Sequence, residues 1–305
     1  MTATALATTI LTFTAIVAVG AALRLAGVLR REDAHPVNAI IIYAGLPAFV
    51  FQVVHGAQLR SDLWGVVAIA WVVFVVMAAL AWGAARLLRL PRQIAGGFII
   101  ACALGNTGFV GYPVTQALFG ARDLPEAVFY DVFGTVGALV LVGLLIAQRY
   151  GDNEECRVNP LRELLTFPAV IALAVGLLMR PLAIPGLVSN GLELLANMVA
   201  PLIMLSVGLS LRFRNIGRNA VSLSVLSGLR LLVAPAIALA VGTVLLGHGL
   251  PLRVAVLEAG MPSMMLTLVV GERFGLDTDF IASAIFVTTA ASAVALPLVQ
   301  LLAFR

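Results

Sequence analysis

The stretch Gly105-Asn106-Thr107-Gly108-Phe109-Val110-Gly111-Tyr112-Pro113 interrupts an apolar segment that is otherwise long enough to cross a membrane. Glycine and proline at this density break a helix. In hydrocarbon each exposed backbone group costs several kcal/mol, so such a break persists only where it lines a polar cavity or is buried in protein. A second apolar segment is interrupted at Gly260-Met261-Pro262-Ser263. Paired broken helices in the two halves of a chain are typical of a transporter's binding site.

The composition indicates a membrane protein. Of the 305 residues, 61% are hydrophobic and 11% are charged, and the mean hydropathy is +1.07, which is too apolar for a soluble domain. Because a spanning helix needs about 20 apolar residues, the sequence predicts an all-α, multi-pass membrane protein with ten spans. The predicted spans are 5–23, 37–55, 63–85, 94–119, 126–147, 167–179, 187–211, 221–246, 252–271 and 280–301, of which the fourth and ninth are broken.

The arginines predict the orientation. Those after spans 1, 3, 5, 7 and 9 number 13, whereas the opposite side has 5, and Arg230 lies within the eighth span. The 13 are Arg24, Arg30, Arg31, Arg86, Arg89, Arg92, Arg149, Arg157, Arg162, Arg212, Arg214, Arg218 and Arg273, and the 5 are Arg60, Arg122, Arg180, Arg253 and Arg305. Since positive loops stay in the cytoplasm, we expect both termini outside it. The net charge of +4 reflects this asymmetry, not a nucleic-acid-binding surface.

The two halves of the chain show an internal repeat. A shift of 154 residues places Leu46-Pro47 on Ala200-Pro201, and a shift of 155 places Gly105 on Gly260. This predicts two repeats of five spans, and because five is odd, the second repeat must enter the membrane in the opposite sense. The predicted organisation is one membrane transport domain over 1–305, with repeats 1–147 and 167–305 joined by a cytoplasmic loop at 148–166.

The inverted repeat places both breaks at the middle of the bilayer. From Ile94, eleven residues of about 1.5 Å each bring Gly105 about 16 Å deep. The broken spans then run antiparallel and cross at the midplane. Because proline suits the first turn of a helix, we expect their second halves to begin near Pro113 and Pro262. Each helix start presents free N–H groups and about +0.5 charge, which favours an anion such as a carboxylate.

Three motifs resemble those of the auxin efflux carrier family. Residues 103–120 are similar to the fourth-helix motif of its bacterial members, Gly-Asn-Thr-x-Phe-x-Gly-x-Pro. The stretch from Glu258 to Ser263 resembles their ninth-helix motif, and Tyr130-Asp131 followed by Gly134 resembles a Tyr-Asp-x-x-Gly pattern on the fifth helix. Plant auxin exporters differ, with Pro-Asn-Thr in the fourth helix and Leu-Pro-Gln-Gly in the ninth.

This resemblance implies a fold related to bile-acid and sodium–proton transporters. Spans 1, 2, 6 and 7 would form a scaffold that makes a homodimer in the cell membrane, and spans 3–5 and 8–10 would form a mobile core. The substrates that it implies are small organic anions, among them auxins, malate and malonate.

The residues of the two breaks are the candidate substrate site. They are Asn106, Thr107, Gly108, Pro113, Met261, Pro262 and Ser263. Asn106 would bind substrate or an ion, although an Asn can also satisfy backbone groups that a break leaves free. The hydroxyls of Thr107 and Ser263 could equally bond back to their own helix.

Three charged residues lie within predicted spans, where charges are costly and usually functional. Asp131 and Glu258 are candidates for ion coupling, because a carboxylate away from water tends to hold a proton and one beside carbonyls could hold Na⁺. Asp131 could instead lie at the interface or pair with an arginine. Arg230 could clamp the carboxylate of the substrate or extend back to the lipid headgroups.

Motifs of enzymes and cofactor sites are missing from the sequence. It contains no Gly-x-Ser-x-Gly, no His-Glu-x-x-His, no metal-ligand spacing and no lysine for a phosphate-binding loop. An internal inverted repeat suits alternating access better than a pore. The sequence therefore predicts a secondary active transporter of a small organic anion, without a cofactor beyond coupling to H⁺ or Na⁺. A channel or sensor on the same fold is the alternative, and an intramembrane enzyme using Asp131 and Glu258 is a more remote one.

Overall fold

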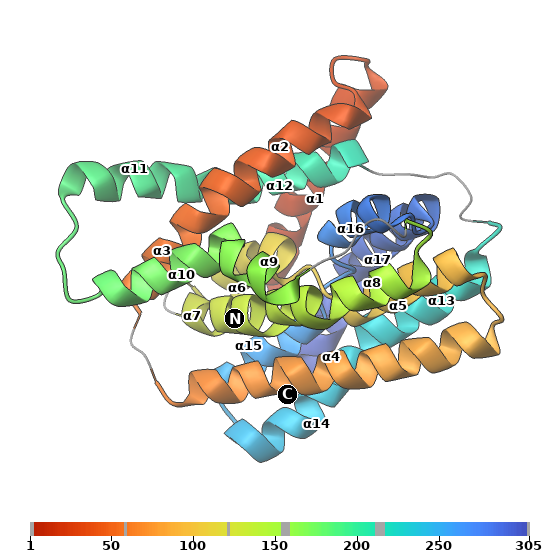
Figure 1. The fold of residues 1–305 in the computed structure, drawn as a ribbon. Coiled ribbons are helices and arrows are strands. Elements are labelled where there is room, and N and C mark those ends of the chain that lie inside the picture. The colour runs from red at the N-terminus through yellow and green to blue at the C-terminus, as the bar shows by residue number, and fades with distance from the viewer. Residues whose placement is uncertain (1–2, 58–59, 121–122, 154–158, 211–216, 304–305) are drawn as a thin grey trace. The chain divides into compact units, whose positions relative to one another are not determined.

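A computed structural model describes residues 3–57, 60–120, 123–153, 159–210 and 217–303, and every regular element within them is a helix (Figure 1). Within these ranges, six helices are long and apolar enough to cross a membrane, or seven if a bent pair counts as one span. The prediction of an all-helical, multi-pass membrane protein is therefore confirmed, whereas ten spans and an inverted repeat stay predictions. Five arginines of the charge asymmetry lie outside the described residues: Arg122, Arg157, Arg212, Arg214 and Arg305.

The predicted apolar segments are helical, and both predicted breaks are present. The α-helices are α1 Ala3–Leu25, α2 Ala34–Ile40, α3 Leu46–His55, α4 Asp62–Leu87, α5 Arg92–Ala103, α6 Tyr112–Phe119, α7 Leu124–Phe129, α8 Leu144–Tyr150, α9 Pro160–Thr166, α10 Pro168–Met179, α11 Gly186–Asn197, α12 Val199–Ser210, α13 Ala220–Gly228, α14 Ala234–Leu246, α15 Leu250–Ala259, α16 Leu266–Phe274 and α17 Thr278–Ala303. A 3₁₀ turn, η1, covers Arg31–Asp33, and π-helical turns cover η2 Ile41–Gly45, η3 Thr107–Gly111, η5 Tyr130–Val136, η6 Leu139–Gly143 and η7 Leu229–Val233.

The first of two compact units comprises Met1–Leu59, Gly108–Val128 and Leu165–Leu211. Within it, α1 packs on α12, and α3 packs on α10 and α11 (Figure 1). Glycine permits the close approach of α1 and α12. A Cβ atom on Gly20 would lie 2.3 Å from the Leu205 carbonyl oxygen, and one on Gly208 would lie 2.1 Å from that of Val17. Small residues at such contacts are usual between membrane helices.

The second unit comprises Arg60–Thr107, Phe129–Leu164 and Arg212–Arg305. Its long helix α4 packs on α5, α14, α15 and η5, while α17 packs on α5 and α13. Each unit takes segments from both halves of the chain. Unit 1 holds predicted spans 1, 2, 6 and 7, and unit 2 holds spans 3, 8, 9 and 10. Span 4 is divided at its break, because Gly108–Val128 belongs to unit 1.

Three of the π-helical turns end two residues before a proline. These are η2 before Pro47, η3 before Pro113 and η7 before Pro235. A proline within a helix lacks an N–H and collides with the carbonyl four residues earlier. A wider turn moves that carbonyl away, so the helix continues past the proline instead of ending.

Candidate functional site

The two breaks lie against each other and run antiparallel. Gly105 and Ser263 form an isolated antiparallel bridge. The N–H of Asn106 donates to the carbonyl of Pro262 at 2.7 Å, and the N–H of Met264 donates to the carbonyl of Leu104 at 3.0 Å. Backbone groups freed by one break are thus satisfied by the other, as a buried backbone requires. The depth of this crossing in a membrane stays a prediction.

The second halves of the broken spans begin elsewhere than predicted. Helical structure resumes at Thr107, in η3, so Pro113 lies within the helix and not at its start. The wide turn before Pro113 makes this possible, as described above. In the other break, α16 begins at Leu266, beyond Pro262. Gly108 and Pro113 belong to unit 1, whereas the other candidate residues belong to unit 2.

The backbone N–H groups of the first two residues after Pro262 already have partners, whereas the predicted anion seat as a whole stays a prediction. The N–H of Ser263 donates to Thr288 Oγ1 at 3.1 Å, and that of Met264 donates to Leu104. Sequence reasoning did not identify Thr288. Its signal is weak, because a hydroxyl in an apolar helix commonly bonds to its own backbone, and Thr288 also donates to the Ala284 carbonyl at 2.7 Å.

Arg230 is 2% exposed, and its guanidinium group donates hydrogen bonds to backbone carbonyls. Its Nε donates to the carbonyl of Met261 at 3.0 Å, and its Nη1 donates to those of Cys102 at 3.3 Å and Ala103 at 3.1 Å. Its Nη2 donates to the carbonyl of Ala259. This corrects both predicted roles. The side chain does not extend to headgroups, and four of its five N–H groups are engaged before any substrate could bind.

Polar side chains of both breaks are buried, and one of them has no hydrogen-bond partner among the described residues. Asn106 is 3% exposed, and the hydroxyl of Ser263, in a fully buried residue, has no partner. Leaving a buried polar group unsatisfied costs about 1–3 kcal/mol. Such groups persist where a ligand can satisfy them, so the Ser263 hydroxyl marks the crossing as a candidate binding site.

Both candidate carboxylates are inside the protein. Asp131 is 4% exposed, in η5, and its Oδ1 accepts a 2.5 Å hydrogen bond from the hydroxyl of Thr107. It therefore lies inside the protein, while its depth in the membrane, on which the interfacial alternative depends, stays a prediction. Glu258 is fully buried in the last turn of α15, directly before the second break. The structure thus places one carboxylate beside the first break and the other beside the second.

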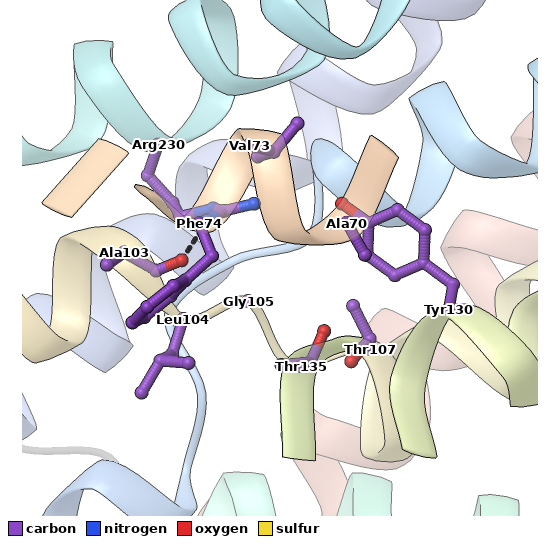
Figure 2. A pocket seen from close by; sticks show the side chains of 10 residues that line it. All are labelled: Ala70, Val73, Phe74, Ala103, Leu104, Gly105, Thr107, Tyr130, Thr135 and Arg230. Carbon is purple, nitrogen blue, oxygen red and sulfur yellow. Dashed lines mark hydrogen bonds between the residues drawn. The ribbon is translucent and has the colours of Figure 1, made fainter. Parts of the chain in front are cut away.

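A small cavity adjoins the crossing, and Figure 2 shows Arg230 and Tyr130 reaching it from two sides. It is lined by Ala70, Val73, Phe74, Ala103, Leu104, Gly105, Thr107, Tyr130, Thr135 and Arg230. Its volume is about 10 Å³, the space of about one water molecule. Thr135 was not among the predicted site residues, although its position one helical turn after Asp131 could have indicated it.

Comparison with known proteins shows the family to which the chain belongs. A protein family described as membrane transport protein matches residues 5–300. The chain belongs to this family, the auxin efflux carriers. It is 36% identical over 293 residues to an uncharacterized transporter of Methanothermobacter thermautotrophicus, covering 95% of this chain and 96% of that one. An uncharacterized transporter of Methanocaldococcus jannaschii is 31% identical over 283 residues, covering 90% and 91%.

Membership confirms the resemblance that the broken-helix motifs indicated. The match extends over nearly the whole chain, so the membrane transport family covers both compact units. The relatives are named as transporters and not as enzymes. The chain is therefore a multi-pass membrane protein of a transport family.

Proposed function

We propose that this chain is a secondary active transporter that moves a small organic anion across the cell membrane by alternating access. The observation that carries the proposal is the crossing, where two helix breaks meet, Asn106 is buried, and the Ser263 hydroxyl is buried without a partner among the described residues. A carboxylate of the substrate would satisfy donors of this kind. The proposal assigns no catalytic residue and no cofactor.

The chemistry beside the crossing supports an anionic group. Arg230 lines the adjoining cavity with the hydroxyl-bearing residues Thr107, Tyr130 and Thr135. Hydroxyl groups of this kind can donate hydrogen bonds to an anionic group. Since the cavity has room for about one water molecule, the whole anion does not fit there as the helices stand. Binding would require the crossing to open, as alternating access does.

The two buried carboxylates would couple transport to an ion gradient. Asp131 is joined to the first break through Thr107, and Glu258 lies in the last turn of the helix that precedes the second. Each is a titratable group beside a break, so either residue could carry a proton during the cycle. A change of protonation at either break would alter the crossing directly.

Uptake into proteoliposomes tests the function. Labelled monocarboxylates and dicarboxylates, malate and malonate among them, would be offered with H⁺ and Na⁺ gradients imposed separately. We expect saturable accumulation of at least one carboxylate that uncharged analogues do not inhibit. Accumulation of cations or sugars in place of every carboxylate would contradict the proposal. A conductance without saturation would favour a channel.

Substitution of Asn106 tests the site. Asn106→Ala removes a hydrogen bond to a charged group, which is worth about 1.5–3 kcal/mol and corresponds to about a 10- to 100-fold weaker affinity. The backbone bond from Asn106 to Pro262 stays, so the variant should fold. Asn197→Ala is the matched control, because Asn197 is exposed at the end of α11. Equal affinity in parent and Asn106→Ala would place the site elsewhere.

Substitution of Glu258 separates binding from coupling. Glu258→Gln keeps the shape but removes the titratable group, so it should abolish gradient-driven accumulation more than it reduces binding. Counterflow, which needs no gradient, should continue in this variant. The matched control is Glu193→Gln, at an exposed position of α11. If accumulation and counterflow fall together, Glu258 binds substrate or maintains the fold and does not couple.

A further inference from the structure

The guanidinium of Arg230 lies where the ends of two half-helices meet. The last carbonyls of a helix have no partner within that helix. Here α5 ends at Ala103 and α15 ends at Ala259, and Arg230 donates to the carbonyls of both residues. Figure 2 shows the bond to Ala103. Further bonds to Cys102 and Met261 engage neighbouring carbonyls of the same two segments.

The charge of this arrangement is balanced within the protein. Each helix C-terminus carries about −0.5 elementary charge. Two such ends therefore present about one negative charge, which the single positive charge of Arg230 offsets. Because Arg230 is 2% exposed, solvent contributes little, and the carbonyls replace its hydration shell.

The surrounding chain leaves room for this cation. The side chain starts from the π-helical turn η7, which widens the helix before Pro235. A Cβ atom on Gly105 would lie 3.1 Å from Nη2 and 3.4 Å from Cζ of Arg230. The first break thus has a glycine, which carries no side chain, at the place where the guanidinium approaches it.

Broken helices of transporters often use these same groups, the carbonyls of unwound segments and helix C-termini, to coordinate a metal cation. In this chain those oxygens accept N–H bonds from a side chain. A Na⁺ ion among them would lose ligands to Arg230 and be repelled by its charge. We infer that Arg230 is a built-in cation that takes the place of Na⁺ at the crossing, so that transport by this chain does not require Na⁺.

This inference narrows the proposed function, on which its transport consequence rests, to coupling by protons or by the membrane potential. Its structural part is independent of any substrate. A test of stability can therefore be made on the purified full-length protein before a substrate is known.

The first measurement is the melting temperature in detergent, in sodium chloride and in choline chloride at equal ionic strength. The parent protein should melt at the same temperature in both. Arg230→Ala leaves four carbonyls without a donor, so we expect its melting temperature to fall by about 10 °C. Millimolar guanidinium chloride should restore about half of this loss, because the free ion can occupy the vacated space. A saturable, Na⁺-specific increase in the parent would overturn the inference.

Two further variants keep the test decisive. Arg86→Ala removes an arginine that is exposed and stacked on Trp82, and it should neither lower the melting temperature as far nor respond to guanidinium. Arg230→Lys keeps the charge but reaches fewer carbonyls, so it should melt between the parent and Arg230→Ala. If Arg230→Ala cannot be purified, the response of the parent to Na⁺ and the melting temperature of Arg230→Lys still test the inference. A folded Arg230→Ala variant that responds to neither guanidinium nor Na⁺ would contradict the inference.

The transport measurement distinguishes this inference from the proposed function. Once a carboxylate substrate is found, its initial uptake rate should be equal with external Na⁺ or choline. Uptake that requires Na⁺ would overturn the built-in cation while leaving organic anion transport intact. A parent protein that is insensitive to Na⁺ yet transports no carboxylate would instead contradict the proposed function alone.

Discussion

Thr107 joins the first break to the segment that carries Asp131 through one buried hydrogen bond of 2.5 Å. Thr107→Val keeps the branched shape and removes the hydroxyl. Asp131 then loses a donor in a buried place, so the free energy of unfolding should fall by about 1–3 kcal/mol. Thermal unfolding of the purified variant measures this change.

The control for this change is Thr107→Ser, which keeps the hydroxyl and loses only a methyl group. It should retain most of the stability of the parent. Should the serine and valine variants be equally destabilised, packing of the methyl group and not the bond to Asp131 would account for the loss.

Single residues differ in how well their surroundings could be predicted. Asn106, Asp131 and Glu258 stand out in the sequence because polar groups are rare in apolar segments, and all three are buried. The acceptors of Arg230 could not be predicted. Its Nη1 reaches the carbonyl of Cys102, 128 residues away in the chain, and only the meeting of separate segments brings them together.

Among the helical elements, the close approach of the first break to Arg230 depends on the glycine at position 105. In Gly105→Ala the new methyl group would lie 3.1 Å from Nη2 of an arginine that four carbonyls hold in place. Overpacking of this kind costs about 1–3 kcal/mol. We therefore expect a lower melting temperature in detergent.

Gly83→Ala is the matched control for the substitution at Gly105. Gly83 lies within α4, and a methyl group added there would have no atom within 4 Å to collide with. Alanine is the better helix former by about 0.5–1 kcal/mol, so this variant should be as stable as the parent or more so. If Gly105→Ala behaves like Gly83→Ala, the crossing tolerates displacement of Arg230.

The positions of the half-helices show a limit of local sequence rules. Proline at the start of a helix is a sound expectation, but η3 begins at Thr107 and carries the helix past Pro113. Proline has no N–H to donate within a helix. The chain can accommodate this either by a π-helical turn before the proline or by beginning a new helix at the proline. Tertiary packing decides between them.

Topology is a prediction for the whole molecule, motivated by the 13-to-5 distribution of arginine. A reporter that fluoresces only in the cytoplasm should stay dark when fused to the C-terminus. The same reporter fused after Gly151, in the predicted cytoplasmic loop, should fluoresce. The reverse pattern would show that the orientation is wrong, and fluorescence from both fusions would show that the span count is wrong.

A homodimer is the second whole-molecule prediction and rests on the family. Light scattering should give the mass of two chains of 31.9 kDa in mild detergent and in lipid nanodiscs. In the scaffold spans, α11 exposes Leu187 and Leu194, at 88% and 74%, so Leu187→Arg with Leu194→Arg would test whether this face takes part. A monomer in both environments would contradict the prediction.

The sequence by itself determined the membrane class, the apolar segments and the two breaks, because hydrophobicity and helix-breaking residues act locally. The resemblance of the breaks to a transport family could also be recognised there. Only the tertiary structure decided that the breaks satisfy each other's backbone, that Gly108–Val128 joins unit 1, and that Arg230 serves two helix ends. These outcomes depend on which distant segments meet, since a buried polar group takes the partner that packing brings within reach.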